Sequence, residues 1–248
     1  VTIYDGDDPD MPMWMVFLLT SNYVWAHTAG GNITSVSMMQ GVLAIGTSGE
    51  NYTWSGAHIE YFLSDWGGIA STATHPRSYS AIANRHQVAD GAYQTYINVG
   101  IIVNSKVNDV AMTVLPNAPI DADTGLPVPT IAVATNGGVS VIKDDGSVVD
   151  IVSSTIVHET PREVKFVDDK VFWVAGNNYD NAWSSVSSTK IPAGDITTPY
   201  ASVTTANALV SKYTPKEWNV ATHAGDLLIP INMQSPRTGA LVELTKDD

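Results

Sequence analysis

The residues best suited to contact a ligand are aromatic side chains in polar loops, which stand among Gly, Ser and Thr rather than in strands. Sugars bind by stacking on exposed aromatic faces with polar groups nearby. The aromatic residues of this kind are Tyr52, Trp54, Trp66 and Tyr79. The alternative is that their rings fill gaps between packed sheets. By contrast, Trp14, Trp25 and Trp173 lie in apolar, strand-like runs and are predicted to be core residues.

Charged residues that could act on a glycan gather in an irregular region of the sequence. They are Glu60, Asp65, Arg77, Arg85 and Asp90. Paired carboxylates held ~5–10 Å apart can perform acid–base chemistry on a glycosidic bond, but a sequence does not give this distance. The Asp-box pattern of sialidase-like propellers, S-x-D-x-G-x-T-W, is not matched by residues 140–149. We therefore predict no catalytic residue.

Metal sites are not predicted either. The six histidines include no pair with the i, i+4 spacing or HExxH context of a zinc site. The absence of cysteine excludes disulfides and thiolate metal sites. Asp121 and Asp123 resemble the start of a calcium loop, but the twelfth residue from Asp121 is Ala132, where an EF-hand needs Glu. We interpret this loop and the acidic loop at residues 5–10 as solvated turns.

The stretch from Leu126 to Asp150 indicates the strands and turns that would position the candidate residues. Residues 131–135 form a short apolar run, as expected for a strand buried on both faces. Asn136-Gly137-Gly138 and Lys143-Asp144-Asp145-Gly146 are turn sequences, because their residues tolerate positive φ. We predict three antiparallel strands joined by tight turns. A phosphate-binding loop requires a helix directly after its glycines, and no helix is expected after these. No cofactor is therefore predicted.

Parts of this pattern recur along the chain. Residues 12–20 align without a gap with residues 127–135, and an acidic loop precedes both. Both apolar runs are therefore expected to be interior strands of four-stranded sheets. A strand–turn–strand element also recurs, at residues 36–46, 164–176 and 219–231, with its turn expected at Gln40-Gly41, Asp168-Asp169 and Ala224-Gly225. One sheet cannot bury both of its faces alone, so such repeats predict stacked sheets.

The predicted fold is all-β and β-propeller-like, with repeated four-stranded antiparallel sheets. The repeats divide a single domain into about five units, at residues 1–36, 36–100, 101–155, 161–205 and 216–248. The last unit lacks its outermost strand and the sequence does not begin with methionine. We therefore expect this sequence to be part of a longer chain.

The charge balance argues against two classes of partner. Lys and Arg number 12 against 25 Asp and Glu, which leaves a net charge of −13. Binding to nucleic acid requires clustered Lys and Arg, so neither nucleic acid nor an anionic membrane is expected as a partner. The most apolar run, residues 11–19, is far shorter than the ~20 residues of a membrane helix. No membrane insertion is therefore predicted.

The run VNDVAMTVLPNAPIDADTGLPVPTIAVATNGGVSVIKDDGSVVDI, residues 107–151, resembles a segment of large virion structural proteins of tailed bacteriophages, particularly marine ones. The segments SDWGG, IANR and PREVKFVDD are similar to pieces of the same proteins. The resemblance implies a propeller-like region in a tail or virion-surface protein, at a virion or extracellular location. The implied partners are other virion proteins or a host surface glycan. The family provides no catalytic motif.

The sequence thus predicts a non-enzymatic virion structural or host-adhesion protein that presents loops from a β-propeller scaffold. Two alternatives stay open, since a fold does not define a function. A glycan-processing enzyme, a glycosidase or lyase, would be favoured by one cleft that gathers arginines and carboxylates. A cellular scaffold propeller would be favoured if the parent gene lay outside a phage genome.

Overall fold

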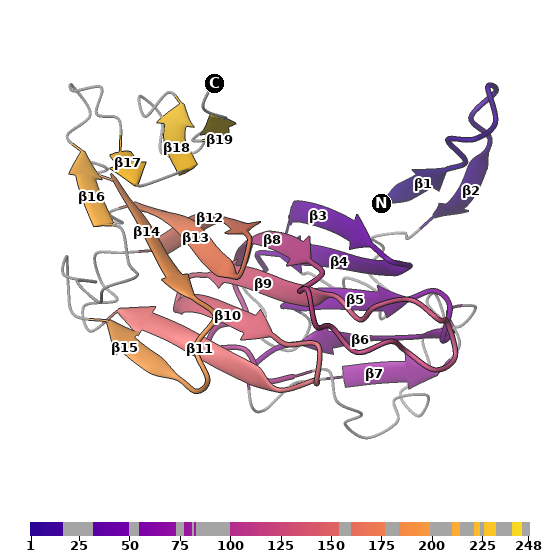
Figure 1. Ribbon diagram of the computed structural model, residues 1–248. Helices are drawn as coiled ribbons and strands as arrows, with labels where there is room; N and C mark the ends of the chain where they lie inside the picture. Colours follow the sequence, from indigo (N-terminus) through magenta and orange to yellow (C-terminus); the bar gives the residue numbers. More distant parts are fainter. Residues whose placement is uncertain are drawn as a thin grey trace.

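The computed structural model describes residues 1–16, 32–49, 55–72, 82, 100–153, 160–176 and 184–198. For residues 77–80, 184–186, 210–213, 221–223, 226–231 and 240–244 it describes the backbone alone. All the named elements of this part of the chain are strands, β1 to β19 (Figure 1). The all-β prediction is therefore confirmed. No helix in the described residues is long and apolar enough to cross a membrane.

Two five-stranded sheets form the centre of the described structure. The first has the spatial order β3 (Ile33–Met39), β4 (Val42–Thr47), β5 (Ala57–Tyr61), β6 (Trp66–Ala70), β7 (Arg77–Ser80). The second has the order β8 (Val107–Thr113), β9 (Thr130–Thr135), β10 (Gly138–Ile142), β11 (Val148–Ser153), β15 (Ile196–Thr198). Neighbours are antiparallel, except that β15 joins β11 in parallel.

Smaller sheets lie before and after these two along the chain. A four-stranded sheet has the order β12 (Thr160–Val167), β13 (Lys170–Gly176), β14 (Ser184–Lys190), β16 (Val210–Tyr213). A three-stranded sheet contains β17 (Ala221–His223), β18 (Asp226–Ile231), β19 (Ala240–Leu244), and the N-terminal hairpin contains β1 (Thr2–Tyr4), β2 (Met13–Val16). The expected four strands per sheet therefore hold for the β12 sheet and are wrong for the two larger ones.

The predicted turns in the described residues lie where the sequence placed them, whereas Ala224 and Gly225 lie outside these residues. Gln40 and Gly41 join β3 to β4 with φ of 50° and 74°. Asp168, at the β12–β13 turn, has a φ of 52°. Positive φ at both central residues, as at Gln40 and Gly41, is the mark of a type I′ turn, which matches the twist of a hairpin. At the β9–β10 turn, the Thr135 hydroxyl accepts a hydrogen bond from the Gly137 amide at 3.1 Å and donates one to the Gly138 carbonyl at 2.8 Å.

The core lies between consecutive sheets, which stack face to face. Ile131 and Val133 pack with the apolar residues of β4, β5 and β8, whereas Ala132 and Ala134 pack with those of β10, β11 and β13. Successive residues of a strand face opposite sides, so a run that is apolar at every position fits a sheet covered on both faces. The prediction of a doubly buried strand at residues 131–135 is confirmed.

The first strands of successive sheets are joined by side-chain hydrogen bonds. The Thr34 hydroxyl of β3 donates to the Val107 carbonyl of β8 at 3.0 Å. The Asn108 amide of β8 donates to the Pro161 carbonyl of β12 at 2.7 Å. These strands lie side by side along one edge of the stack (Figure 1). Among the described strands the stack is not seen to close into a ring, so the propeller stays a prediction.

The N-terminal run differs from its internal counterpart. In the described residues β2 pairs with β1 alone, and Met13 and Trp14 are 61% and 55% exposed. The expectations of an interior strand and of a core Trp14 are therefore wrong for this part of the run. The physical reason is that a two-stranded hairpin at the end of a stack has one covered face. Residues 17–20 and Trp25 lie outside the described residues, and Trp173 is buried as predicted.

Candidate functional site

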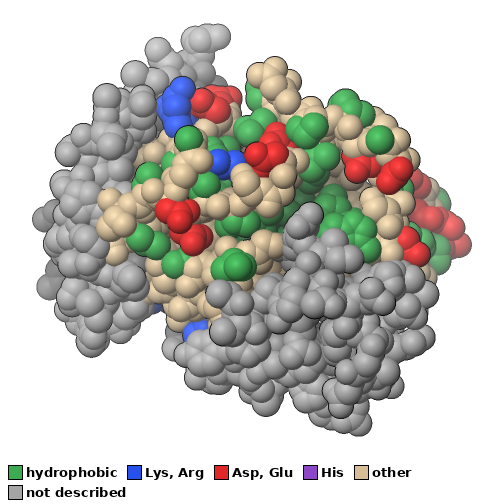
Figure 2. All heavy atoms as spheres, turned by 90° about the horizontal axis from the view of Figure 1, so that it is seen from below, with side chains coloured by type: hydrophobic (Ala, Val, Ile, Leu, Met, Phe, Trp, Pro, Cys, Tyr) green, Lys and Arg blue, Asp and Glu red, His purple; other side chains and the backbone are tan. Residues whose placement is uncertain are grey.

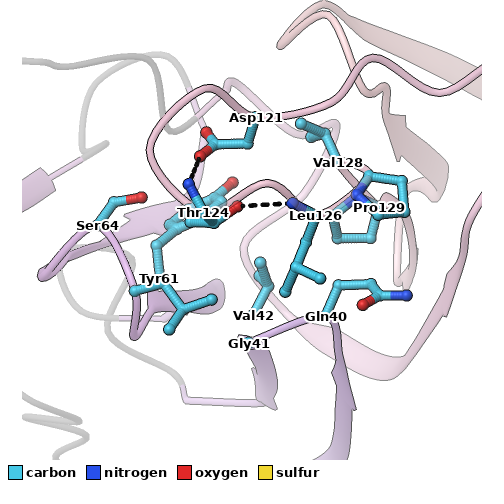
Figure 3. Close-up of a pocket in the computed structure, with 12 residues that line it drawn as sticks. Gln40, Gly41, Val42, Tyr61, Ser64, Asp121, Thr124, Leu126, Val128 and Pro129 are labelled. Carbon is cyan, nitrogen blue, oxygen red and sulfur yellow. Dashed lines mark hydrogen bonds between the residues drawn. The ribbon is translucent and has the colours of Figure 1, made fainter.

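A pocket lies where three connections meet at one end of the two large sheets (Figure 3). The Gln40–Gly41 turn, the β5–β6 turn and the loop between β8 and β9 each contribute residues to it. The pocket contains about 350 Å³ of empty space, open solvent included.

One side of the pocket is apolar. Val42, the first residue of β4, and Leu126 lie close to each other beneath the opening (Figure 3). Pro127, Val128 and Pro129, which lead into β9, extend this surface. The backbone holds Leu126 in place, because its carbonyl accepts a hydrogen bond from the Asp121 amide at 2.9 Å and its amide donates to Thr124 Oγ1 at 3.2 Å. This surface is preformed by the loop's own hydrogen bonds.

An aromatic pair forms another side. Tyr61 ends β5 and lines the pocket, and Trp66 begins β6 directly opposite it in the register. The two rings stack with centroids 4.2 Å apart and 16° between their planes. Since Tyr61 also pairs with Val42, Trp66 lies on the side of Tyr61 away from the apolar surface. Burial raises the pKa of the Tyr61 phenol to about 12, so its hydroxyl stays protonated.

The polar side of the pocket carries Gln40, Ser64, Asp121 and Thr124. Asp121 Oδ1 accepts hydrogen bonds from the backbone amides of Thr124, at 2.9 Å, and Asp123, at 3.1 Å. Hydrogen bonds from the backbone and side chain of Thr124 lower the pKa of this carboxyl, since they favour its charged form. Asp121 is therefore a fixed, ionised acceptor at the rim.

The structure tests only part of the predicted aromatic site. Tyr52 and Trp54 lie outside the described residues. Trp66 and Tyr79 lie in β6 and β7, so the expectation that they stand in loops is wrong. The glycines after Trp66 are extended and pair with β5 and β7, where Tyr79 is opposite Gly67. Of the four residues, Trp66 lies next to the pocket, through its contact with Tyr61.

Sequence reasoning missed Tyr61 as a site residue. It ends an apolar run and precedes the Ser64–Asp65 turn, a signal that could have placed it at the mouth of a hairpin. The sequence could not show that the β8–β9 loop approaches Tyr61 and contributes to the same pocket. This loop is distant in sequence and meets Tyr61 only because the two large sheets stack.

Of the charged residues weighed for catalysis, the two whose side chains the structure describes, Glu60 and Asp65, do not line the pocket. Glu60 is fully buried and, as the neighbour of Tyr61 on β5, faces the other side of the sheet. Asp65 Oδ1 accepts a hydrogen bond from the Ile82 amide at 2.8 Å, which supports the β5–β6 turn. Arg77 belongs to β7, where the backbone alone is described, and Arg85 and Asp90 lie outside the described residues.

The acidic loops have the hydrogen bonding of turns. Asp5 Oδ1 accepts a hydrogen bond from the Asp7 amide at 3.0 Å and Asp8 Oδ1 accepts one from the Asp10 amide at 2.9 Å. Asp121 does the same with the amides of its own loop. Within the described ranges no three His, Cys, Asp or Glu residues converge as a metal site would require. The absence of a calcium site stays a prediction.

Comparison with known proteins gives few likenesses. No known protein-family model matches the chain, and no curated protein matches its sequence. Among solved structures, the Phage phi92 endosialidase is similar, with a TM-score of 0.41 and 11% sequence identity. The alignment covers 91% of this chain and 44% of the endosialidase chain, so the chain spans less than half the length of that protein. A likeness at this level establishes neither fold nor activity for the chain.

Proposed function

We propose that this chain is a glycan-binding module that attaches a virion to a surface glycan through the pocket at Tyr61. The observation that carries the proposal is the composition of the pocket. An aromatic ring, an apolar surface and several polar groups line the same pocket. A sugar ring is chemically complementary to such a pocket, because its C–H faces stack on aromatic rings and its hydroxyls form hydrogen bonds.

The scaffold of this module is proposed to be a β-propeller. Successive meanders stack face to face in chain order, and their first strands β3, β8 and β12 lie side by side. This is how the blades of a propeller are arranged around its axis. The pocket then lies at the loop ends of two adjacent blades, where recognition by a rigid scaffold usually occurs.

The proposed location on a virion rests on the sequence resemblance of residues 107–151 to phage virion proteins. The described structure is compatible with it, because these residues form β8 to β11 and the loop that lines the pocket. The proposed partners are a host surface glycan at the pocket and other virion proteins elsewhere on the surface.

Binding without turnover is proposed, with a glycosidase or lyase as the alternative. Of the described residues that line the pocket, Asp121 alone carries a charge. Hydrogen bonds lower its pKa, whereas a general acid must keep its proton near neutral pH. Asp121 is therefore suited to accept hydrogen bonds from a ligand and is poorly suited to protonate a leaving group.

The test uses a panel of immobilised bacterial and surface glycans, followed by calorimetry with the glycans that are bound. Tyr61→Leu removes the ring and is expected to abolish binding. Tyr4→Leu is the matched control, because Tyr4 lies in the N-terminal hairpin and is 54% exposed, so binding should persist. Thermal unfolding of each variant shows whether it is folded. Tyr61→Phe provides a second test, since it keeps the ring and should retain part of the affinity.

Two results would contradict the proposal. If no glycan binds, or if folded Tyr61→Leu binds as the wild type does, the pocket is not the site. If the wild type shortens a bound glycan, as measured by release of reducing ends or unsaturated products, the enzyme alternative replaces binding without turnover.

A further inference from the structure

The charge carried by the described lining of the pocket is negative. Among the described residues that line it there is no Lys, Arg or His, and the charged group among them is the carboxylate of Asp121. Asp123, two residues after Asp121, adds a second acidic residue to the same loop. Sites that bind carboxylates or phosphates normally supply Arg or Lys for them, and this pocket does not.

The charge of the whole chain has the same sign as that of Asp121. The whole chain carries a net charge of −13. On the face shown in Figure 2, acidic side chains are spread over the described surface and basic side chains are fewer. The summed field of such a surface repels anions as they approach and lowers their local concentration.

We infer that the pocket binds uncharged hexopyranose glycans and disfavours glycans that carry sialic or uronic acid. The inference rests on the proposed glycan-binding function and names its ligand class. The hydroxyls of a neutral sugar donate to the Asp121 carboxylate, which is a charge-assisted hydrogen bond. The apolar face of the same ring stacks on Tyr61, and its remaining hydroxyls pair with Gln40, Ser64 or Thr124.

Asp121 is pre-organised for this role. Its carboxylate is held by two backbone amides of its own loop, so little conformational entropy is lost when a sugar hydroxyl binds. Its position beside the apolar surface of Leu126 places acceptor and stacking surface in one small volume (Figure 3). A carboxylated sugar in the same place would bring two like charges together without a cation between them.

The experiment compares matched oligosaccharides with and without a terminal sialic acid, or with glucose in place of glucuronic acid, by calorimetry at low salt. The neutral member of each pair is expected to bind roughly tenfold more tightly, because like charges a few ångströms apart repel by an amount of this order. This difference in affinity between the neutral and the acidic glycan is called the affinity gap. Raising the salt to ~0.5 M should narrow the affinity gap, since exposed charges are screened.

Two variants assign the discrimination to the pocket. Asp121→Asn removes the charge and keeps an oxygen acceptor for the amides of the loop, so the acidic glycan should gain affinity and the affinity gap should shrink. Asp145→Asn is the matched control. Asp145 also accepts a backbone amide, from Ser147 at 2.8 Å, but lies in the β10–β11 turn away from the pocket. Its substitution should leave the affinity gap unchanged.

The outcomes separate this inference from the proposed function. If no glycan binds, the proposed function fails. If the acidic member binds more tightly than the neutral one at the Tyr61 pocket, the function stands and the inference is overturned. The inference is also overturned if the affinity gap survives in Asp121→Asn, or if Asp145→Asn closes it to the same degree.

Discussion

Tyr61 and Trp66 stack across the β5–β6 pair with ring centroids 4.2 Å apart and 16° between their planes. Tyr61 lines the pocket and Trp66 lies against its other side. Trp66, which the sequence pointed to, therefore supports Tyr61, the residue that is placed to contact a ligand.

Removing Trp66 tests this supporting role. Trp66→Leu is expected to weaken glycan binding several-fold and to destabilise the fold by about 1–3 kcal/mol, because an aromatic pair adds about 0.5–1.5 kcal/mol to the burial of its area. Trp66→Phe keeps a stacked ring and should lie close to the wild type in both respects. Denaturant unfolding and calorimetry measure the two effects. A variant with lost stability and unchanged affinity would show that Trp66 has no part in the site.

The doubly buried strand β9 gives a stability prediction. Ile131 is 1% exposed and packs between the two large sheets, so Ile131→Ala should lower the free energy of unfolding by about 2–5 kcal/mol. Ile120→Ala is the control, because Ile120 is 61% exposed and its truncation should cost less than about 0.5 kcal/mol. Urea unfolding followed by fluorescence distinguishes them. Equal costs would mean that β9 is not part of the core.

Gly138 begins β10 in a conformation that other residues avoid. Its φ is 145°, and a Cβ atom would lie 2.5 Å from the Ile151 carbonyl oxygen of the neighbouring strand. Gly138→Ala should therefore destabilise the protein by about 1–3 kcal/mol or more. Gly6→Ala is the control, because a Cβ atom there meets no atom within 4 Å. Thermal unfolding of both variants checks the prediction, and a harmless Gly138→Ala would contradict this geometry.

Asp109 links the first strands of adjacent sheets and predicts a pH dependence. Its Oδ2 accepts a hydrogen bond from the Val164 amide at 2.8 Å. Burial raises the pKa of this carboxyl, although hydrogen bonds from Ser35 and from the amides of Val164 and Val110 oppose the shift. The folded protein then binds the proton more tightly than the unfolded chain does. The contribution of Asp109 to stability is therefore greatest below its unfolded pKa and falls as pH rises through its folded pKa.

The variant Asp109→Asn removes this titration and keeps an acceptor for the Val164 amide. Its stability relative to the wild type should improve as the pH rises from about 4 to 7. Free energies of unfolding at both pH values, for both proteins, measure the change. A difference between the proteins that is independent of pH would show that Asp109 is not perturbed by burial.

The acidic loops predict no response to calcium. Oδ1 atoms of Asp5, Asp8 and Asp121 already accept backbone hydrogen bonds, as in turns that need no ion. The melting temperature should therefore be equal in EDTA and in millimolar Ca²⁺. A site with a Kd of ~10 μM would add roughly 3 kcal/mol at about one hundred times that concentration. A rise of several degrees would contradict the interpretation.

The sequence by itself determined the strands and turns whose causes are local. Gln40–Gly41 and Asp168 take up positive φ at hairpins, and the residues around Asn136 form the β9–β10 turn. The run at residues 131–135 is a strand buried on both faces, as its unbroken apolar pattern indicates. These features depend on the conformational preferences of a few adjacent residues, so a short stretch of sequence is enough to predict them.

Only the tertiary structure decided which surfaces are covered and which residues meet. Trp14 has the same kind of neighbours in sequence as a core residue, but it lies on the hairpin at the end of the stack and is exposed. Strand β15 joins β11 in parallel, against the antiparallel pattern of the repeats. The pocket brings Gln40, Tyr61 and Asp121 together from three connections far apart in the chain. Their proximity depends on how two sheets face each other, and no local preference encodes that.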